Sequence, residues 1–176
     1  MRKQPVMLHS KQKGTIGEIS VIKSLLKKGY SVFTEVGDLS RVDLIAIVEN
    51  VPIKIQVKST SVDNGAVEIY TRKSGPGYSY RYTEQDVDIF AIYIENKDIV
   101  LYIAAKELLK NERSLKLRFD APKNGQKAKI RDAWKYSTFE DALRDHTPSI
   151  LPKKEDDDMI QTTKGEILAG ESQCGR

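Results

Sequence analysis

Two apolar runs separated by two polar residues constrain the fold of this chain more than any other feature. The runs are residues 42–48 and 51–59, and Glu49 and Asn50 lie between them. If the chain turns there, one face pairs apolar residues throughout: Val48 with Val51, Ala46 with Ile53, Leu44 with Ile55 and Val42 with Val57. A slip of one residue would mix the two faces, so the pattern predicts a β-hairpin in this register. A two-residue or a four-residue turn is compatible with it.

The opposite face of the predicted hairpin carries polar side chains at one end. Asp43 would lie directly across from Gln56. Lys58 would point the same way as Gln56, because side chains in a strand alternate with period two. Directly opposed residues have Cβ atoms about 5 Å apart. The pattern therefore predicts that a carboxylate, an amide and an ammonium group converge.

A helix is predicted from Thr15 to Lys28, with Gly29 as its stop. Glu18 is the one charged residue within its apolar arc, which comprises Ile16, Ile19, Val21, Ile22, Leu25 and Leu26. A buried carboxylate costs several kcal/mol unless it is paired or bound to a metal. We therefore expect the helix to bring Glu18 to Asp43. The structural alternative is a capping box, with Thr15 at the N-cap and Glu18 at N3.

The rest of the chain predicts an α/β fold, with a mixed sheet of four or five strands flanked by helices. Further strands are expected at 31–35, 66–71, 88–94, 99–104 and 115–119, and helices at 105–110 and 138–144. A loop is expected at 73–80, which contains two glycines and a proline. We expect a basic N-terminal arm at 1–13, one folded domain at 14–146 and a disordered acidic tail at 147–176.

The charge of the chain favours an acidic partner, of which nucleic acid is the commonest. The net charge is +4 with a pI near 9.0. The segment 147–176 holds four basic and six acidic residues, so residues 1–146 carry +6. The single cysteine excludes an internal disulfide and a cysteine-based zinc site. No signal peptide or apolar run of about 18 residues is present, so we expect no membrane contact and a soluble, cytoplasmic protein.

The predicted polar cluster suits a hard divalent cation, which prefers oxygen ligands. Asp43 would be the central ligand, with the side-chain carbonyl of Gln56 and the backbone carbonyl of Val57 beside it. Glu18 could bind the metal directly or hold a water. Lys58 would orient or activate the attacking water and offset charge on a phosphate. We expect Mg²⁺ as the cofactor, with Mn²⁺ as a substitute.

These residues resemble a known family. Asp43, a strand, a turn and Gln56-Val57-Lys58 look like the signature of the PD-(D/E)XK nucleases. The helix with Gly14-Thr15-Ile16-Gly17-Glu18 is similar to the glutamate-bearing first helix of many members. Lys13-Gly14, Asp43-Leu44, Ile55-Gln56-Val57-Lys58 and the stretch from Tyr82 to Phe90 resemble the intron-encoded homing endonucleases of this fold. The resemblance covers residues 11–105.

The resemblance implies a PD-(D/E)XK restriction-endonuclease-like core and a metal-dependent endonuclease that cuts both strands of DNA. The catalytic residues would be Glu18, Asp43, Gln56 and Lys58. Gln56 stands where most members have a second acid, and glutamine is expected there in the homing subgroup. Cutting two strands requires two sites, so a homodimer or homotetramer is expected. The alternatives are a Holliday-junction resolvase, a restriction-type nuclease or an inactive DNA-binding module.

Basic and aromatic residues surround the predicted glycine loop. Arg72, Lys73, Tyr78 and Arg81 are the candidates for DNA contact, since such side chains track phosphates and arginine can grip guanine edges. A solvated loop is the alternative. A second basic stretch, from Lys123 to Arg131, is expected to be a surface connection.

Overall fold

A five-stranded sheet forms the centre of the computed structural model, which describes residues 9–36, 39–75, 77–120 and 131–146. The strand order is β1-β2-β3-β7-β8. Their bounds are Ser31–Thr34, Leu44–Val48, Val51–Thr60, Ile89–Ile94 and Ile99–Ala104. Neighbours pair antiparallel except β3 and β7, which are parallel. The predicted mixed sheet is therefore confirmed.

The β2–β3 hairpin has the predicted register. Leu44 pairs with Ile55, Ala46 with Ile53 and Val48 with Val51. The turn is the two-residue one. Both of its residues, Glu49 and Asn50, have positive φ, 47° and 62° respectively. Positive φ at both turn residues matches the twist of the flanking strands, so the apolar pairing holds even though Glu-Asn is not the favoured turn sequence.

Two helices cover the face of the sheet that carries the apolar pairs. These are α1 (Ser10–Lys27) and α3 (Phe139–His146), which pack with β2, β3 and β8 in one buried cluster. Gly17 lies against β3, where an added Cβ would come 2.0 Å from Ser59 Oγ. The predicted apolar arc of α1 is too broad. The buried residues are Gly17, Val21 and Leu25, whereas Ile19 and Leu26 are more than half exposed.

The N-terminal end of α1 differs from the predicted one. The helix begins at Ser10, five residues before the expected N-cap, so residues 10–13 of the predicted basic arm belong to the helix. His9 precedes the helix, and its backbone N–H donates to Gln12 Oε1 at 2.9 Å. Glu18 therefore lies in the helix interior, and the capping-box alternative for this residue is wrong.

A second layer covers the other face of the sheet. It contains a two-stranded sheet of β4 (Ala66–Tyr70) and β9 (Ser114–Arg118), the helix α2 (Ala105–Leu109) and the 3-10 turn Ala133–Tyr136. Its apolar residues form a second cluster with Phe90, Ile92, Leu101 and Ile103. The elements expected near residues 66–71, 105–110, 115–119 and 138–144 are thus present, with ends shifted by one or two residues.

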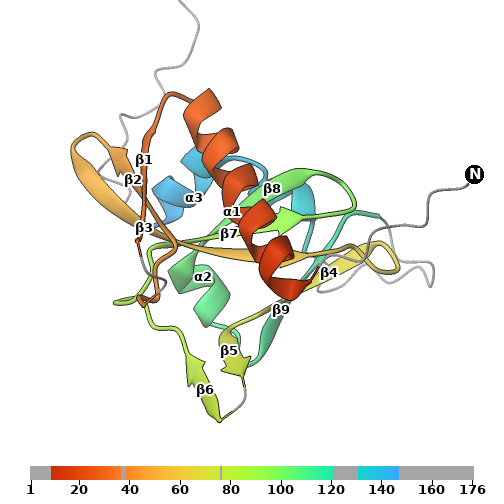
Figure 1. Cartoon of the computed structure of the whole chain (residues 1–176). Helices are drawn as coiled ribbons and strands as arrows, with labels where there is room; N and C mark the ends of the chain where they lie inside the picture. Colours follow the sequence, from red (N-terminus) through yellow and green to blue (C-terminus); the bar gives the residue numbers. More distant parts are fainter. Residues whose placement is uncertain (1–8, 37–38, 76, 121–130, 147–176) are drawn as a thin grey trace, which may run out of the picture.

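The segment expected to be a loop forms a second hairpin. Strands β5 (Arg72–Gly75) and β6 (Tyr78–Arg81) pair antiparallel, and Figure 1 shows them projecting from the main body of the molecule. Most side chains in these strands are polar, so the strands lack the alternation of apolar and polar residues that predicts a strand. The expected tail at 147–176, most of the arm and most of the second basic stretch lie outside the described residues. No helix in the described part of the chain is long and apolar enough to cross a membrane.

Candidate active site

Asp43 occupies the position just before β2, and its backbone N–H donates to Ile55 O at 3.0 Å. This bond continues the hairpin beyond its last ladder pair, so the side chain faces β3 as predicted. The carboxylate oxygen Oδ2 accepts hydrogen bonds from the backbone N–H of Val57, at 2.7 Å, and from Gln56 Nε2. Two donors on one strand therefore fix the orientation of this carboxylate.

The amide of Gln56 lies between two oxygen atoms. Gln56 is only 5% exposed, and its Nε2 donates both to Asp43 Oδ2 and, at 3.1 Å, to the backbone carbonyl of Val57. A carboxylate and a carbonyl thus converge on a single point, which the amide NH₂ group fills. Hard divalent cations prefer this pair of oxygen types. If the amide turned, its own Oε1 could join the two oxygens as a third ligand.

Lys58 lies on the same face, beneath two aromatic rings. Its Nζ is 4.9 Å from the centre of the Tyr82 ring and 5.9 Å from that of Phe90. Burial lowers the pKa of Lys58 to about 8, the negative charge of Asp43 opposes this shift, and the positive charge of Lys73 adds to it. A lysine with this pKa can hold or release a proton near neutral pH, as a group that assists hydrolysis must.

Glu18 is half-buried on α1, one residue after the close contact of Gly17 with Ser59. Since Ser59 follows Lys58, the helix places Glu18 at the end of β3 that carries the polar cluster. No three side chains of His, Cys, Asp or Glu gather as metal ligands anywhere in the described segments. The expected donor set has two carboxylates, Asp43 and Glu18, and the carbonyl oxygens of Gln56 and Val57 are its other expected protein donors.

Three residues beside the cluster were not identified from the sequence as site residues. Tyr82 is 2% exposed, and its ring lies against the ammonium group of Lys58. The Arg41 guanidinium lies 4.6 Å from the centre of the Tyr80 ring and binds Asp86 at 3.0 Å. Tyr80 and Tyr82 belong to the basic and aromatic stretch around the predicted loop, and Tyr82 also begins the stretch that resembles the homing subgroup, but neither pattern predicts a place beside Lys58. The contact of Arg41 with Tyr80 joins distant segments, so it has no signal in the local sequence.

The four candidates for DNA contact divide between the two faces of the β5–β6 hairpin. Lys73 pairs with Tyr80 on one face, together with Tyr78, and Arg72 pairs with Arg81 on the other. Arg81 Nη2 donates to the backbone carbonyls of Leu109, at 2.7 Å, and Asn111, at 3.2 Å. Arg81 therefore ties the hairpin to the end of α2, whereas Lys73 lies near enough to Lys58 to affect its pKa.

Comparisons with known proteins agree with this architecture. No curated protein sequence matches the chain. The solved structure of a bacterial homing endonuclease matches with a TM-score of 0.62 at 24% identity, over 73% of this chain and 88% of that one. At this identity the likeness shows the fold alone. The family model described as PD-(D/E)XK endonuclease matches residues 8–139, a stretch that contains every residue of the polar cluster. With the sheet, the Asp43–Gln56–Lys58 cluster and this match in agreement, the chain belongs to the PD-(D/E)XK endonuclease family.

Proposed function

We propose that this protein is a metal-dependent endonuclease that hydrolyses phosphodiester bonds of double-stranded DNA in the manner of a homing endonuclease. The observation that carries the proposal is the convergence of Asp43 Oδ2 and the Val57 carbonyl on one point, with Lys58 beside it. Family membership supports nuclease chemistry, and the net charge of +6 on residues 1–146 supports a polyanionic substrate.

Mg²⁺, or Mn²⁺ in its place, fits the donor set of Asp43, Gln56, Val57 and Glu18. When bound, such an ion supplies Lewis-acid stabilisation of the charge that develops on the phosphate. Asp43 is held by the Val57 N–H, so its carboxylate is already oriented before any ligand arrives. To bind the ion, Gln56 would give up the two hydrogen bonds that its Nε2 donates and would present its Oε1 instead. Glu18 would complete the set from α1, directly or through water.

Lys58 would act on the attacking water and on the scissile phosphate. Its protonated form offsets negative charge on the phosphate, and its neutral form accepts a proton. The Tyr82 and Phe90 rings keep the ammonium group away from bulk water. The same side chain can therefore serve in either protonation state at neutral pH, because its pKa is about 8.

DNA would lie against the β5–β6 hairpin. The exposed Tyr78 and the half-buried Lys73 face the side of the active site, and Arg72 contributes a guanidinium from the other face. Lysine and arginine at such positions bind phosphates and set the register of the duplex. Cleavage of both strands would require two copies of the site, which favours a homodimer or homotetramer.

Plasmid cleavage tests this function. The purified protein should nick or linearise supercoiled plasmid in Mg²⁺ and lose this activity in EDTA. An inactive DNA-binding module is the second candidate, because the NH₂ group of Gln56 fills the point on which the oxygens converge. Retained DNA binding with no cleavage in Mg²⁺ or Mn²⁺ would favour that candidate. Cleavage confined to four-way junctions would identify a resolvase instead.

A further inference from the structure

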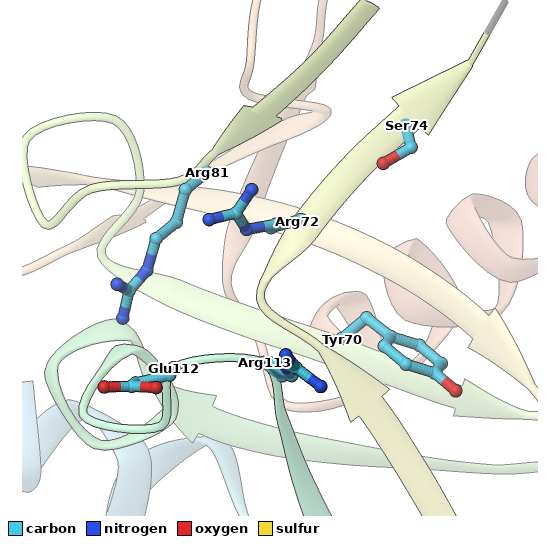
Figure 2. Close-up of a pocket in the computed structure, with 6 residues that line it drawn as sticks. All are labelled: Tyr70, Arg72, Ser74, Arg81, Glu112 and Arg113. Carbon is cyan, nitrogen blue, oxygen red and sulfur yellow. The ribbon is translucent and has the colours of Figure 1, made fainter.

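A large cavity lies beside the β5–β6 hairpin, on the face that carries the two arginines. Its volume is about 820 Å³, within the range of ligand sites in proteins. Figure 2 shows its lining, which comes from the end of β4, from both strands of the hairpin and from the turn before β9. The lining residues are Tyr70, Arg72, Ser74, Arg81, Glu112 and Arg113.

Cations predominate in this lining, and two of them are available for a ligand. The Arg81 guanidinium is occupied by the carbonyls of Leu109 and Asn111. Among the residues that the structure describes, the side chains of Arg72 and Arg113 have no hydrogen-bond or salt-bridge partner, and both line the cavity. In Figure 2 Arg113 lies between Tyr70 and Glu112, whereas Arg72 lies near Arg81. Guanidinium groups bind phosphates with two parallel hydrogen bonds, so each of these two side chains suits a phosphate group.

Tyr70 supplies an aromatic surface at the same cavity. Its side chain is 58% exposed, and its hydroxyl donates to Glu68 at 3.3 Å, which fixes the ring without covering it. The next residue, Thr71, is fully buried and bonds Arg113 O through both its N–H and its hydroxyl, each at 3.0 Å. These two hydrogen bonds hold the backbone of Tyr70, Arg72 and Arg113 in place before a ligand binds.

A smaller cavity shares lining residues with the larger one and also borders Lys58. Its volume is about 250 Å³, and Lys58, Tyr70 and Arg72 are among its lining residues. Tyr70 and Arg72 therefore border both cavities, with Lys58 on one side and Arg113 on the other. A polymer whose phosphate lies at Lys58 could continue past Tyr70 into the larger cavity.

We propose that the larger cavity binds unpaired nucleotides of the DNA strand that flanks the cleaved bond. Phosphates would contact Arg72 and Arg113, and a base would stack on Tyr70. A base can stack on this ring only when its face is free, so the cavity selects a local single strand rather than an intact duplex. The inference rests on the proposed nuclease function. It predicts that the DNA strand beside the cleaved bond is locally unpaired when bound.

Binding of a fluorescein-labelled short oligothymidylate in EDTA tests this site without any cleavage. The full-length wild type should bind it. Tyr70→Ala should weaken binding about 5- to 150-fold through the lost stacking, whereas Tyr70→Phe should bind like wild type. Arg113→Ala should weaken binding and also lower the slope of log K against log salt by about 0.7. Lys106→Ala, an exposed charge on α2 outside the cavity, is the matched control.

The outcomes separate this inference from the proposed function. Failure of the wild type to bind, or equal binding by Tyr70→Ala, Arg113→Ala and Lys106→Ala, would overturn the strand site. Competition by inorganic phosphate as strong as that by unlabelled oligothymidylate would reduce it to a simple anion site and overturn it as well. If the variants lose strand binding but the wild type cuts no DNA, the strand site stands and the nuclease function fails.

Discussion

In the β2–β3 hairpin the polar side chains bind one another, whereas in the β5–β6 hairpin several of them face solvent. Asp43 is held by two donors, Gln56 is buried, and Lys58 lies under aromatic rings. The Arg72 side chain, by contrast, is exposed and makes no hydrogen bond with the described residues. Chemistry requires groups that are oriented before the substrate arrives, and recognition tolerates groups that adapt to it. The difference predicts large effects on cleavage from the first hairpin and smaller effects on binding from the second.

The largest effect is expected from Asp43→Ala. The substitution removes the oriented carboxylate, so cleavage should fall by at least about 1,000-fold, as expected when several kcal/mol of metal-dependent stabilisation is lost. DNA affinity should stay the same or rise, because a negative charge is removed. Single-turnover cleavage and binding isotherms check both expectations. Asp145→Ala, at an exposed position of α3, is the control. Full activity of Asp43→Ala in Mg²⁺ would show that the site is assigned wrongly.

Lys58→Met should abolish cleavage and stabilise the fold. The pKa of Lys58 drops from 10.5 to about 8 on folding, so below pH 8 the buried charge costs about 3 kcal/mol. Between pH 8 and 10.5 the folded protein has released a proton that the unfolded chain still holds, so wild-type stability should rise with pH in this window. Lys58→Met should lack that rise. Urea denaturation at pH 7 and pH 10 measures it, and parallel pH dependence of the two proteins would contradict the burial of this charge.

Glu18→Gln tests whether α1 contributes to the site. If Glu18 binds metal or orients water, cleavage should fall about 10- to 100-fold with an unchanged melting temperature. A capping role for Glu18 is excluded, because this residue lies in the helix interior. Glu84→Gln, at an exposed position, is the control. A cleavage rate equal to that of the wild type would return Glu18 to a structural role.

Gln56→Glu tests whether the buried amide of the first hairpin lies at a metal site. Without metal, the new carboxylate loses both hydrogen bonds of Nε2 and faces Asp43, so the melting temperature should fall by about 5 °C. Added Mg²⁺ or Mn²⁺ should raise the melting temperature more than in the wild type, because the site gains a negative ligand. Gln85→Glu places the same charge at an exposed position. Identical metal responses of the two variants would argue against a metal at Gln56.

The smallest effects are expected at the β5–β6 hairpin, where Lys73 and Arg81 should differ in kind. Lys73→Ala should weaken binding to specific and scrambled duplexes equally and lower the salt slope by about 0.9. Arg81→Ala should instead lower stability by about 1–2 kcal/mol, because its bonds to the carbonyls after α2 are lost. Salt titrations and denaturant unfolding separate the two. Loss of DNA affinity in Arg81→Ala at unchanged stability would reverse these assignments.

Local sequence patterns suffice to predict the β2–β3 hairpin and the residues that meet across it. Apolar pairing selects one register, and strand periodicity then places Asp43, Gln56 and Lys58 on one face. Both rules act between residues close in the chain, so no knowledge of the rest of the fold was needed. The same rules failed for β5 and β6, whose polar strands carry no apolar alternation.

The chemical environment of these residues depends on contacts between segments that are distant in the chain. Tyr82 and Phe90 lie far along the chain from Lys58, yet their rings lie against its ammonium group, and burial at this place lowers its pKa. The buried stripe of α1 is narrower than its apolar arc, because only Gly17, Val21 and Leu25 are buried against the sheet. Packing between distant segments sets burial, charge and cavity shape, and these quantities depend on the whole fold rather than on local periodicity.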